Sequence, residues 1–185
     1  IRYTEQSLVL RQEIGDQQGE AMALMRKGTS LWFTGEHQGA YDIIKQALSM
    51  AEDLNNSFLL AQGLSIMGEI YYQQQDYDRA YAHYIRAVDS DSIHKIMAFQ
   101  RFALIGLASV LEQRGEYEHA LELVAMTKHE DTASFIKYID DKAKALQDRL
   151  CHELGEVVAR EAMARGKSKT LEQAIAELRN GSVTS

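Results

Sequence analysis

The chain has 185 residues, of which 45% are hydrophobic and 25% are charged, the proportions of a soluble globular protein with one sizeable core. A formal charge of −7 argues against a nucleic-acid-binding face as the main function, and the single cysteine, Cys151, excludes an internal disulfide and fits a cytoplasmic location. No apolar run reaches the roughly 20 residues that cross a bilayer, so we expect no membrane association.

Proline is absent from the sequence, although average usage of about 5% would supply roughly nine. Sheets with tight turns usually contain some proline, whereas long helices joined by glycine or polar turns need none. The composition therefore predicts an all-α fold. Because the first residue is Ile1 rather than methionine, we also expect the sequence to be a piece of a longer protein.

Apolar residues at helical spacing predict three successive helix pairs after a leading half-repeat at residues 1–16. The expected helices cover residues 18–34 and 37–53, 58–74 and 77–89, and 97–113 and 117–128. These pairs define repeats at about 17–56, 57–96 and 97–128. Residues 129–185 are expected to form capping helices and a tail, with one long helix over 129–153 and residues 154–164 either continuing it or forming a second helix.

Small residues recur with a period of 40 and set the register of the pairs. Alanine stands at 40, 80 and 120, and the position twelve before each is Gly28, Gly68 or Ala108. Agreement of several positions at one period predicts stacked repeats, in which small residues allow two helices to approach closely. Gly35 and Gly115 are expected to end first helices in the left-handed conformation, where Gln75 replaces them. Asp76 is expected to cap the helix that follows it.

The segment LSIMGEIYYQQQDYDRAYAHYIRAV, Leu64 to Val88, resembles a tetratricopeptide repeat in its spaced apolar residues, Gly68, Tyr71, Ala80 and Tyr84. The other two pairs match more loosely, the closing proline of the family is missing, and the period is 40 rather than 34. The resemblance implies a right-handed superhelix of helix pairs, a C-terminal helical extension and a concave groove that binds a protein or peptide. It also implies a non-catalytic role.

The segment Leu154 to Asn180 resembles the end of bacterial signal-transducing NTPases and large transcriptional regulators. It has Leu-Gly-Glu at 154–156, an Ala-x-Gly turn at Gly166, and Thr-Leu-Glu-x-Ala at 170–174. The resemblance implies a sensor module whose partner or signal acts on an adjacent NTPase domain of the same chain. A free-standing scaffold or adaptor and a homo-oligomerisation module are the alternatives.

Candidate chemistry is sparse, so we expect no enzyme, catalytic residue, cofactor or metal. His152 and Glu156 are four residues apart on one expected helix, but the metalloprotease pattern needs a second histidine where Glu156 stands. Cys151 is interpreted as a partly buried helix residue. The basic run of Arg160, Arg165, Lys167 and Lys169 is interpreted as a solvated turn rather than as a site for an acidic partner or nucleic acid.

The groove of the family is lined by first-helix positions beside the small residue, and these positions transfer to the present chain. The candidate partner-binding residues are Met22, Met25, Thr29, Trp32, Phe33, Gln62, Ser65, Glu69, Tyr72, Gln73, Phe102, Ile105, Ser109 and Glu112, with Gln113 beside them. The family's carboxylate clamp needs basic residues and asparagine where Met25, Thr29, Ser65 and Glu69 stand, so a C-terminal carboxylate is not the expected ligand.

An apolar cluster on the first helix, Met22, Met25, Trp32 and Phe33, has two interpretations. It packs against a preceding helix, or it forms an adaptable recognition surface, for which methionine and aromatic residues are well suited. The sequence leaves both open.

Overall fold

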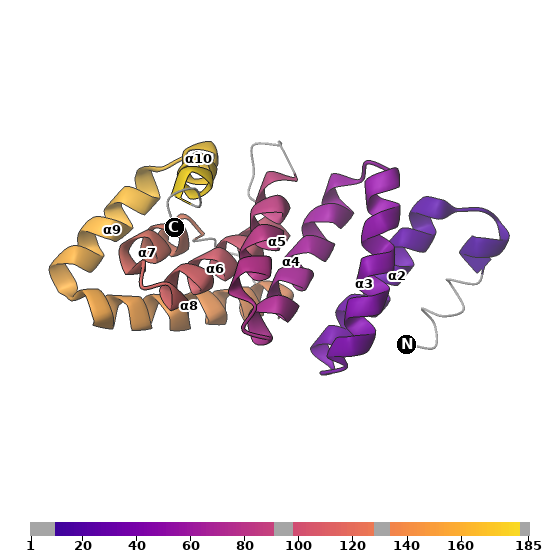
Figure 1. Cartoon of the computed structure of the whole chain (residues 1–185), viewed down its shortest axis with the longest axis horizontal. Coiled ribbons are helices and arrows are strands. Elements are labelled where there is room, and N and C mark those ends of the chain that lie inside the picture. Colours follow the sequence, from indigo (N-terminus) through magenta and orange to yellow (C-terminus); the bar gives the residue numbers. More distant parts are fainter. Residues whose placement is uncertain (1–9, 91–97, 128–133, 182–185) are drawn as a thin grey trace. The chain divides into compact units, whose positions relative to one another are not determined.

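The computed structural model describes residues 10–90, 98–127 and 134–181, and over these ranges the chain is helical and without strands (Figure 1). The predicted all-α, tetratricopeptide-like repeat fold is confirmed. Residues 1–9 lie outside the described residues, as does most of the helix predicted for the leading half-repeat; residues 10–13 are helical. The chain divides into two compact units, residues 1–92 and 93–185. The repeat boundaries given above stay predictions.

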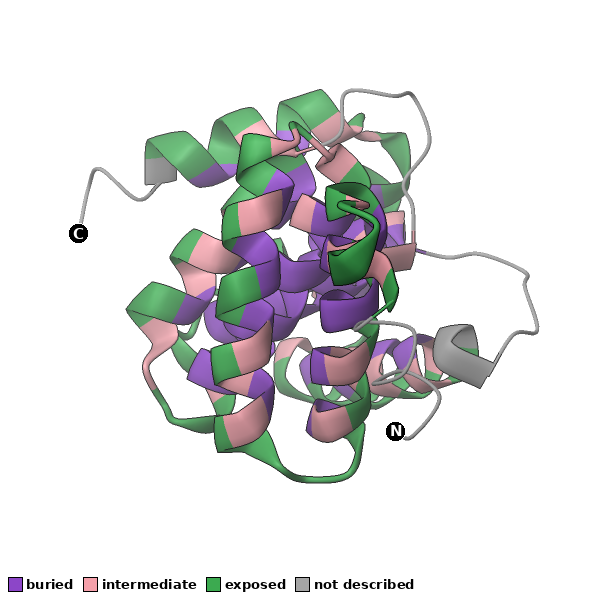
Figure 2. Cartoon of the chain, turned by 90° about the vertical axis from the view of Figure 1, so that its right-hand side faces the viewer, coloured by how far each residue is buried: buried purple, intermediate pink, exposed green. Residues whose placement is uncertain are grey.

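The first unit contains two antiparallel helix pairs, whose members lie side by side (Figure 1). Its helices are α2 (Gln17–Phe33), α3 (His37–Asp53), α4 (Ser57–Gln73) and α5 (Tyr77–Asp89). Each begins and ends within one residue of its predicted position. Helix α4 packs against α2, α3 and α5, and residues 61–71 on it are all buried. Figure 2 shows that buried residues gather on the sides of the helices that face one another.

Turns of one shared geometry occur at intervals of 20 residues from Gly15 to Gln75 and again at Gly115. In each, a residue with positive φ ends a helix: Gly15, Gly35, Asn55, Gln75 and Gly115, with φ of 71°, 85°, 49°, 62° and 78°. The N–H of the following residue reaches back five positions, as in Glu36 to Leu31 at 2.9 Å and Asp76 to Tyr71 at 3.0 Å. This is the Schellman motif, and it satisfies carbonyls that the helix end would leave unpaired.

The residue after each positive-φ position also starts the next helix. The side chain of Asp16 accepts from Gly19 N, that of Asn56 from Leu59 N, and that of Asp76 from Arg79 N. The predicted cap at Asp76 is therefore confirmed, while the cap positions Glu36 and Glu116 make no such side-chain bond. In the first unit a three-residue turn closes one helix and opens the next, so the connections within its two pairs and the connection between them have the same length.

The small residues of the register form notches for a bulky partner. A Cβ on Gly28 would lie 2.5 Å from Ile44 Cγ1, and a Cβ on Gly68 would lie 2.6 Å from two ring carbons of Tyr84. The partner in the notch is thus the residue four after the alanine. Tyr84 is fully buried, and its hydroxyl donates to the buried Glu69 carboxylate at 2.8 Å.

The second unit begins with α6 (Ala98–Gln113) and α7 (Tyr117–Met126), close to the predicted third pair, and continues with α8 (Ser134–Leu154), α9 (Glu156–Ser168) and α10 (Leu171–Gly181). Residues 97, 128 and 129–133 of the predicted helices lie outside the described residues. Gly155, with φ of 74°, separates α8 from α9, so residues 156–168 form a second helix. The expected Ala-x-Gly turn is wrong, because Gly166 lies buried inside α9.

Helix α9 packs along α7 and covers a face that the corresponding helices of the first unit leave open. Asp42 in α3 and Ala82 in α5, each two residues after the recurring alanine, are exposed. Glu122, at the equivalent position of α7, is buried. The contact is close, since a Cβ on Gly166 would lie 2.2 Å from the carbonyl oxygen of Glu122. Glycine at 166 lets the two backbones meet, and this contact brings the charged groups of α9 over Glu122.

Candidate functional site

The groove positions predicted from the register divide into buried and accessible side chains. Those buried are Met25, Trp32, Gln62, Ser65, Glu69, Phe102, Ile105 and Ser109. Those partly or largely exposed are Met22, Thr29, Phe33, Tyr72, Gln73, Glu112 and Gln113. A partner that approaches the chain as it is folded here can touch only the second set.

The apolar cluster on α2 is split between the core and the surface. Met25 is fully buried and Trp32 is 5% exposed, whereas Met22 is 42% and Phe33 50% exposed. Phe33 still contacts the edge of Trp32, with ring centroids 4.6 Å apart. Of the two interpretations left open by the sequence, packing describes Met25 and Trp32, whereas Met22 and Phe33 keep about half of their surface accessible.

Met22 and Phe33 share one stripe of α2 with Arg26 and Thr29, since spacings of 4, 7 and 11 residues return to nearly the same helix face. Arg26 is exposed and Thr29 is partly exposed. The Thr29 hydroxyl donates to Met25 O at 2.7 Å and accepts from Gln62 Nε2 of α4 at 3.2 Å. We call Met22, Arg26, Thr29 and Phe33 the α2 stripe; its middle is joined to α4 by the hydrogen bond between Gln62 and Thr29.

Polar groove candidates in the other first helices already have partners within their own units. The hydroxyls of Ser65 and Ser109 donate to the carbonyls four residues earlier, Ala61 O and Ile105 O. Glu112 accepts two hydrogen bonds from Arg149 of α8, at 2.7 and 2.9 Å. These groups satisfy the helices and their contacts, so their polarity does not by itself indicate a ligand.

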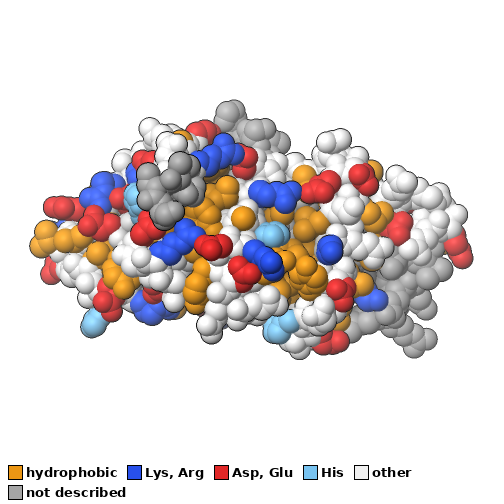
Figure 3. Space-filling model, in the orientation of Figure 1, with side chains coloured by type: hydrophobic (Ala, Val, Ile, Leu, Met, Phe, Trp, Pro, Cys, Tyr) orange, Lys and Arg blue, Asp and Glu red, His pale blue; other side chains and the backbone are white. Residues whose placement is uncertain are grey.

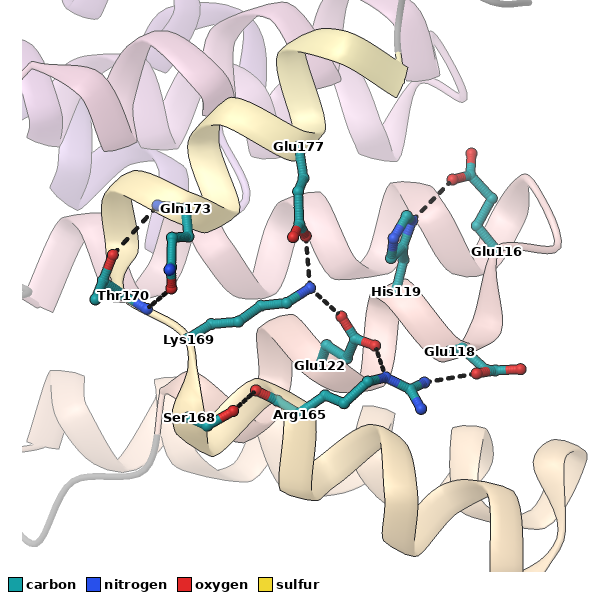
Figure 4. A network of polar contacts seen from close by, with 10 residues as sticks. All are labelled: Glu116, Glu118, His119, Glu122, Arg165, Ser168, Lys169, Thr170, Gln173 and Glu177. Carbon is teal, nitrogen blue, oxygen red and sulfur yellow. Dashed lines mark hydrogen bonds and ion pairs between the residues drawn. The ribbon is translucent and has the colours of Figure 1, made fainter.

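A charged cluster that the sequence did not predict joins α7, α9 and α10 (Figure 4). Its centre is the carboxylate of Glu122, whose side chain is 5% exposed. Arg165 donates to Glu122 and to Glu118, both at 2.6 Å, and Lys169 donates to Glu122 and to Glu177. Two of the four residues of the basic run therefore hold α9 and α10 to α7, and the interpretation of that run as a solvated turn is wrong for Arg165 and Lys169.

The pKa values within the cluster follow from burial and pairing. Burial alone raises the pKa of Glu122, but hydrogen bonds from Lys169 and Arg165 outweigh it, so the pKa lies below its ordinary value. Burial lowers the pKa of Lys169, but its bonds to Glu122 and Glu177 outweigh this effect and raise it. The bonds to Glu122 and Glu118 raise the pKa of Arg165. All three groups are charged at neutral pH.

An open pocket of about 510 Å³ adjoins the cluster and is lined by the start of α7, by Leu154 and by Arg165. His119, Glu122 and Glu177 place potential metal-ligand atoms within 4.8 Å of one another. Both carboxylates, however, accept from the ammonium of Lys169, so the protein itself supplies the cation at this position. The arrangement is that of a structural ion cluster.

The remaining candidates for chemistry are dispersed. His152 and Glu156 belong to different helices, because Gly155 ends α8, and their side chains are 89% and 86% exposed. Burial raises the pKa of Cys151, which disfavours its reactive thiolate.

On the face drawn in Figure 3, acidic and basic side chains are interspersed and form no broad basic surface. Within the described ranges, no helix combines the length and apolarity that crossing a bilayer requires.

The fold and these surfaces define an all-α helical-repeat protein. The family model described as tetratricopeptide repeat matches residues 64–92, which span most of α4 and all of α5. Comparison with curated proteins and with solved structures gave no match. Tetratricopeptide repeats generally mediate protein–protein interaction, and the chain is consistent with a non-catalytic interaction module.

Proposed function

We propose that the chain is a non-catalytic module that binds a protein segment on the α2 stripe. The observation that carries this proposal is the exposure of Met22 and Phe33, at 42% and 50%, on one face of a first helix in a tetratricopeptide-like repeat. Methionine and aromatic side chains suit recognition surfaces because they offer a large and adaptable apolar contact.

The stripe also specifies the chemistry of its occupant. Met22 and Phe33 are 11 residues apart, which corresponds to about 16 Å along a helix. Arg26 lies between them and is exposed. The complementary segment is an amphipathic helix with two apolar anchors about three turns apart and an acidic residue between them.

Binding of displayed peptides tests this proposal. A library of amphipathic helical peptides with acidic central residues is selected on the chain, and the affinities of the selected peptides are measured by fluorescence anisotropy. We expect the Met22→Ala/Phe33→Ala double variant to lose at least about tenfold in affinity, since each buried anchor contributes on the order of 1 kcal/mol or more. Val157→Ala is the matched control, because Val157 is 65% exposed and lies on α9 in the second unit. Equal binding by the double variant would exclude the α2 stripe.

We propose further that the module belongs to a larger cytoplasmic bacterial regulator and transmits a protein or ligand signal to an adjacent NTPase domain. The resemblance of residues 154–180 to the end of such regulators supports this proposal. The coding sequence upstream of Ile1 in the native gene tests it: a nucleotide-binding module there agrees with a sensor, and its absence favours a free-standing scaffold or adaptor. Light scattering across protein concentration tests homo-oligomerisation, for which the mass would rise with concentration.

A further inference from the structure

Lys169 occupies the short connection between α9 and α10 and ties three helices together (Figure 4). Its backbone is extended, with φ of −78° and ψ of 145°, and only Thr170 follows it before α10 begins. Its ammonium donates to Glu122 on α7 and to Glu177 on α10. A single side chain at the hinge therefore links α10 to α7 through two ion pairs.

Helix α9 is held to α7 without help from Lys169. Gly166 meets the backbone of Glu122, and Ala159 and Ala162 are buried on α9. Arg165 donates to two carboxylates one turn apart on α7, those of Glu118 and Glu122. Loss of Lys169 would leave these contacts in place, so α9 provides a fixed base for movement at the hinge.

Helix α10 has its own start signal and a small buried face. Thr170 N donates to Gln173 Oε1 at 2.9 Å, and Gln173 N donates to Thr170 Oγ1 at 3.3 Å, which is a capping box. Among the residues of α10 whose burial is described, only Ala174 and Leu178 are buried. The helix can begin at Thr170 whether or not it is held against α7.

The charges of the cluster do not balance. Glu118, Glu122 and Glu177 carry three negative charges, whereas Arg165 and Lys169 carry two positive charges. Glu122 is the most buried of the three carboxylates and is bound by both cations. Glu177, whose side chain is 46% exposed, is bound by Lys169, which also binds Glu122. Of the two ion pairs of Lys169, the one with Glu177 is consequently the more open to screening by salt.

We propose that α10 is a releasable strap, latched by Lys169 between Glu122 and Glu177, whose release leaves α9 docked on α7. Release exposes Leu178 and leaves the Glu177 carboxylate without its pairing to Lys169. Salt opens the latch by screening the two ion pairs of Lys169.

Hydrogen exchange followed by mass spectrometry on the whole chain tests this proposal. In Lys169→Met, amides of residues 173–180 should lose about three- to tenfold in protection, the range expected for partly buried ion pairs, while amides of α9 keep theirs. Glu177→Gln should have the same direction of effect while leaving both cations on Glu122. Arg160→Met is the control, because its pair with Glu156 is exposed and lies within α9.

A salt series separates the latch from a general loss of packing. When NaCl is raised from about 0.05 M to about 1 M, the distance over which charges interact shortens to about 3 Å. The amide protection of α10 should therefore fall in the wild type and stay constant in Lys169→Met. Unchanged protection of α10 in both Lys169→Met and Glu177→Gln would overturn the proposal. An equal loss of protection in α9 and α10 would also overturn it, since the two helices would then open as one cap.

Discussion

The aromatic ring of Tyr84 lies against Gly68 so closely that an added Cβ would come within 2.6 Å of two of its carbons. The same contact occurs 40 residues earlier between Ile44 and Gly28. In both pairs the second helix inserts a bulky side chain into the notch that glycine leaves in the first helix. The register of the repeat is therefore maintained by the fit of one large residue to one missing side chain.

Gly68→Ala should destabilise the chain by about 1–3 kcal/mol, because the buried ring of Tyr84 must shift to admit the methyl group. Urea denaturation followed by circular dichroism measures the change. Gly39→Ala is the matched control: it lies in α3, where the nearest atom to an added Cβ is Leu31 Cδ1 at 3.6 Å. There the better helix propensity of alanine should stabilise the protein by about 0.5–1 kcal/mol. Equal effects of the two substitutions would contradict the notch.

Gln75→Gly should stabilise the first unit by about 0.5–1 kcal/mol. Gln75 holds φ at 62°, a conformation that costs a residue with a Cβ about 1–2 kcal/mol, and the greater freedom of glycine in the unfolded chain offsets part of this gain. The reverse change, Gly115→Gln, should destabilise the second unit, where φ at this position is 78°. Thermal unfolding of the two variants is the measurement, and a lower melting temperature for Gln75→Gly would refute the assignment of strain.

Glu122→Gln should destabilise the chain at neutral pH by about 1–3 kcal/mol, because the buried carboxylate that binds Arg165 and Lys169 with its two oxygens becomes a neutral amide with one accepting oxygen. The pKa of Glu122 is lowered on folding, so its contribution is complete above the pKa of an unfolded glutamate, about 4.3, and is lost as pH falls through the lower folded pKa. The difference between wild type and variant should thus be constant from about pH 6 to 8 and shrink below about pH 4. Urea midpoints measured across pH test this, and a difference that grows in acid would show the opposite sign of linkage.

Gly166→Ala should separate α9 from α7 or displace it, since the methyl group would lie 2.2 Å from a backbone carbonyl that cannot rotate away. The expected result is lower amide protection in α9 together with a lower melting temperature. Lys167→Ala serves as the control, because Lys167 is the exposed neighbour on the same helix. Full retention of α9 protection in Gly166→Ala would show that the two backbones are not in contact.

Much of the architecture follows from local chemistry that is visible in the sequence. The 40-residue period of Ala40, Ala80 and Ala120 predicted the pairs and their bounds, because each register position has the same packing task in every pair. The shorter recurrence, that of the turns, was not predicted, and the reason is physical. The positive-φ positions fall every 20 residues from 15 to 75, but glycine, asparagine and glutamine all occupy them, so their common geometry is not visible as a common residue type.

The charged cluster could not be found from spacing, because Glu122 is 43 residues from Arg165 and 47 from Lys169. A weaker signal was present in α7. Its residues Leu121, Leu123 and Ala125 are apolar and buried. The equivalent residues of α3, which are Tyr41, Ile43 and Lys45, are partly or largely exposed. A second helix that is apolar on most sides indicates an additional covering element, which α9 provides.

Sequence register identified the face of α2 that carries Met22, Met25, Trp32 and Phe33 but not the depth of each side chain. Met22 and Met25 are three residues apart, so their side chains point in directions that differ by about 60° around the helix axis. This difference is enough to leave Met22 exposed while Met25 is buried. The distinction depends on where α3 and α4 lie, and local spacing contains no information on that. Whether the α2 stripe binds a partner stays a prediction.

The identical three-residue turns have a consequence for how such an array changes length. Because in the first unit the turns within the pairs and the turn between them are built alike, a 40-residue segment there can be removed or duplicated in either of two frames, starting at a first helix or at a second helix. Both frames end at the same kind of junction, with a positive-φ residue followed by a helix cap. In gene duplication or in engineering, the natural building block of the first unit is thus one helix with its turn, and adding or removing two of them keeps first and second helices in alternation.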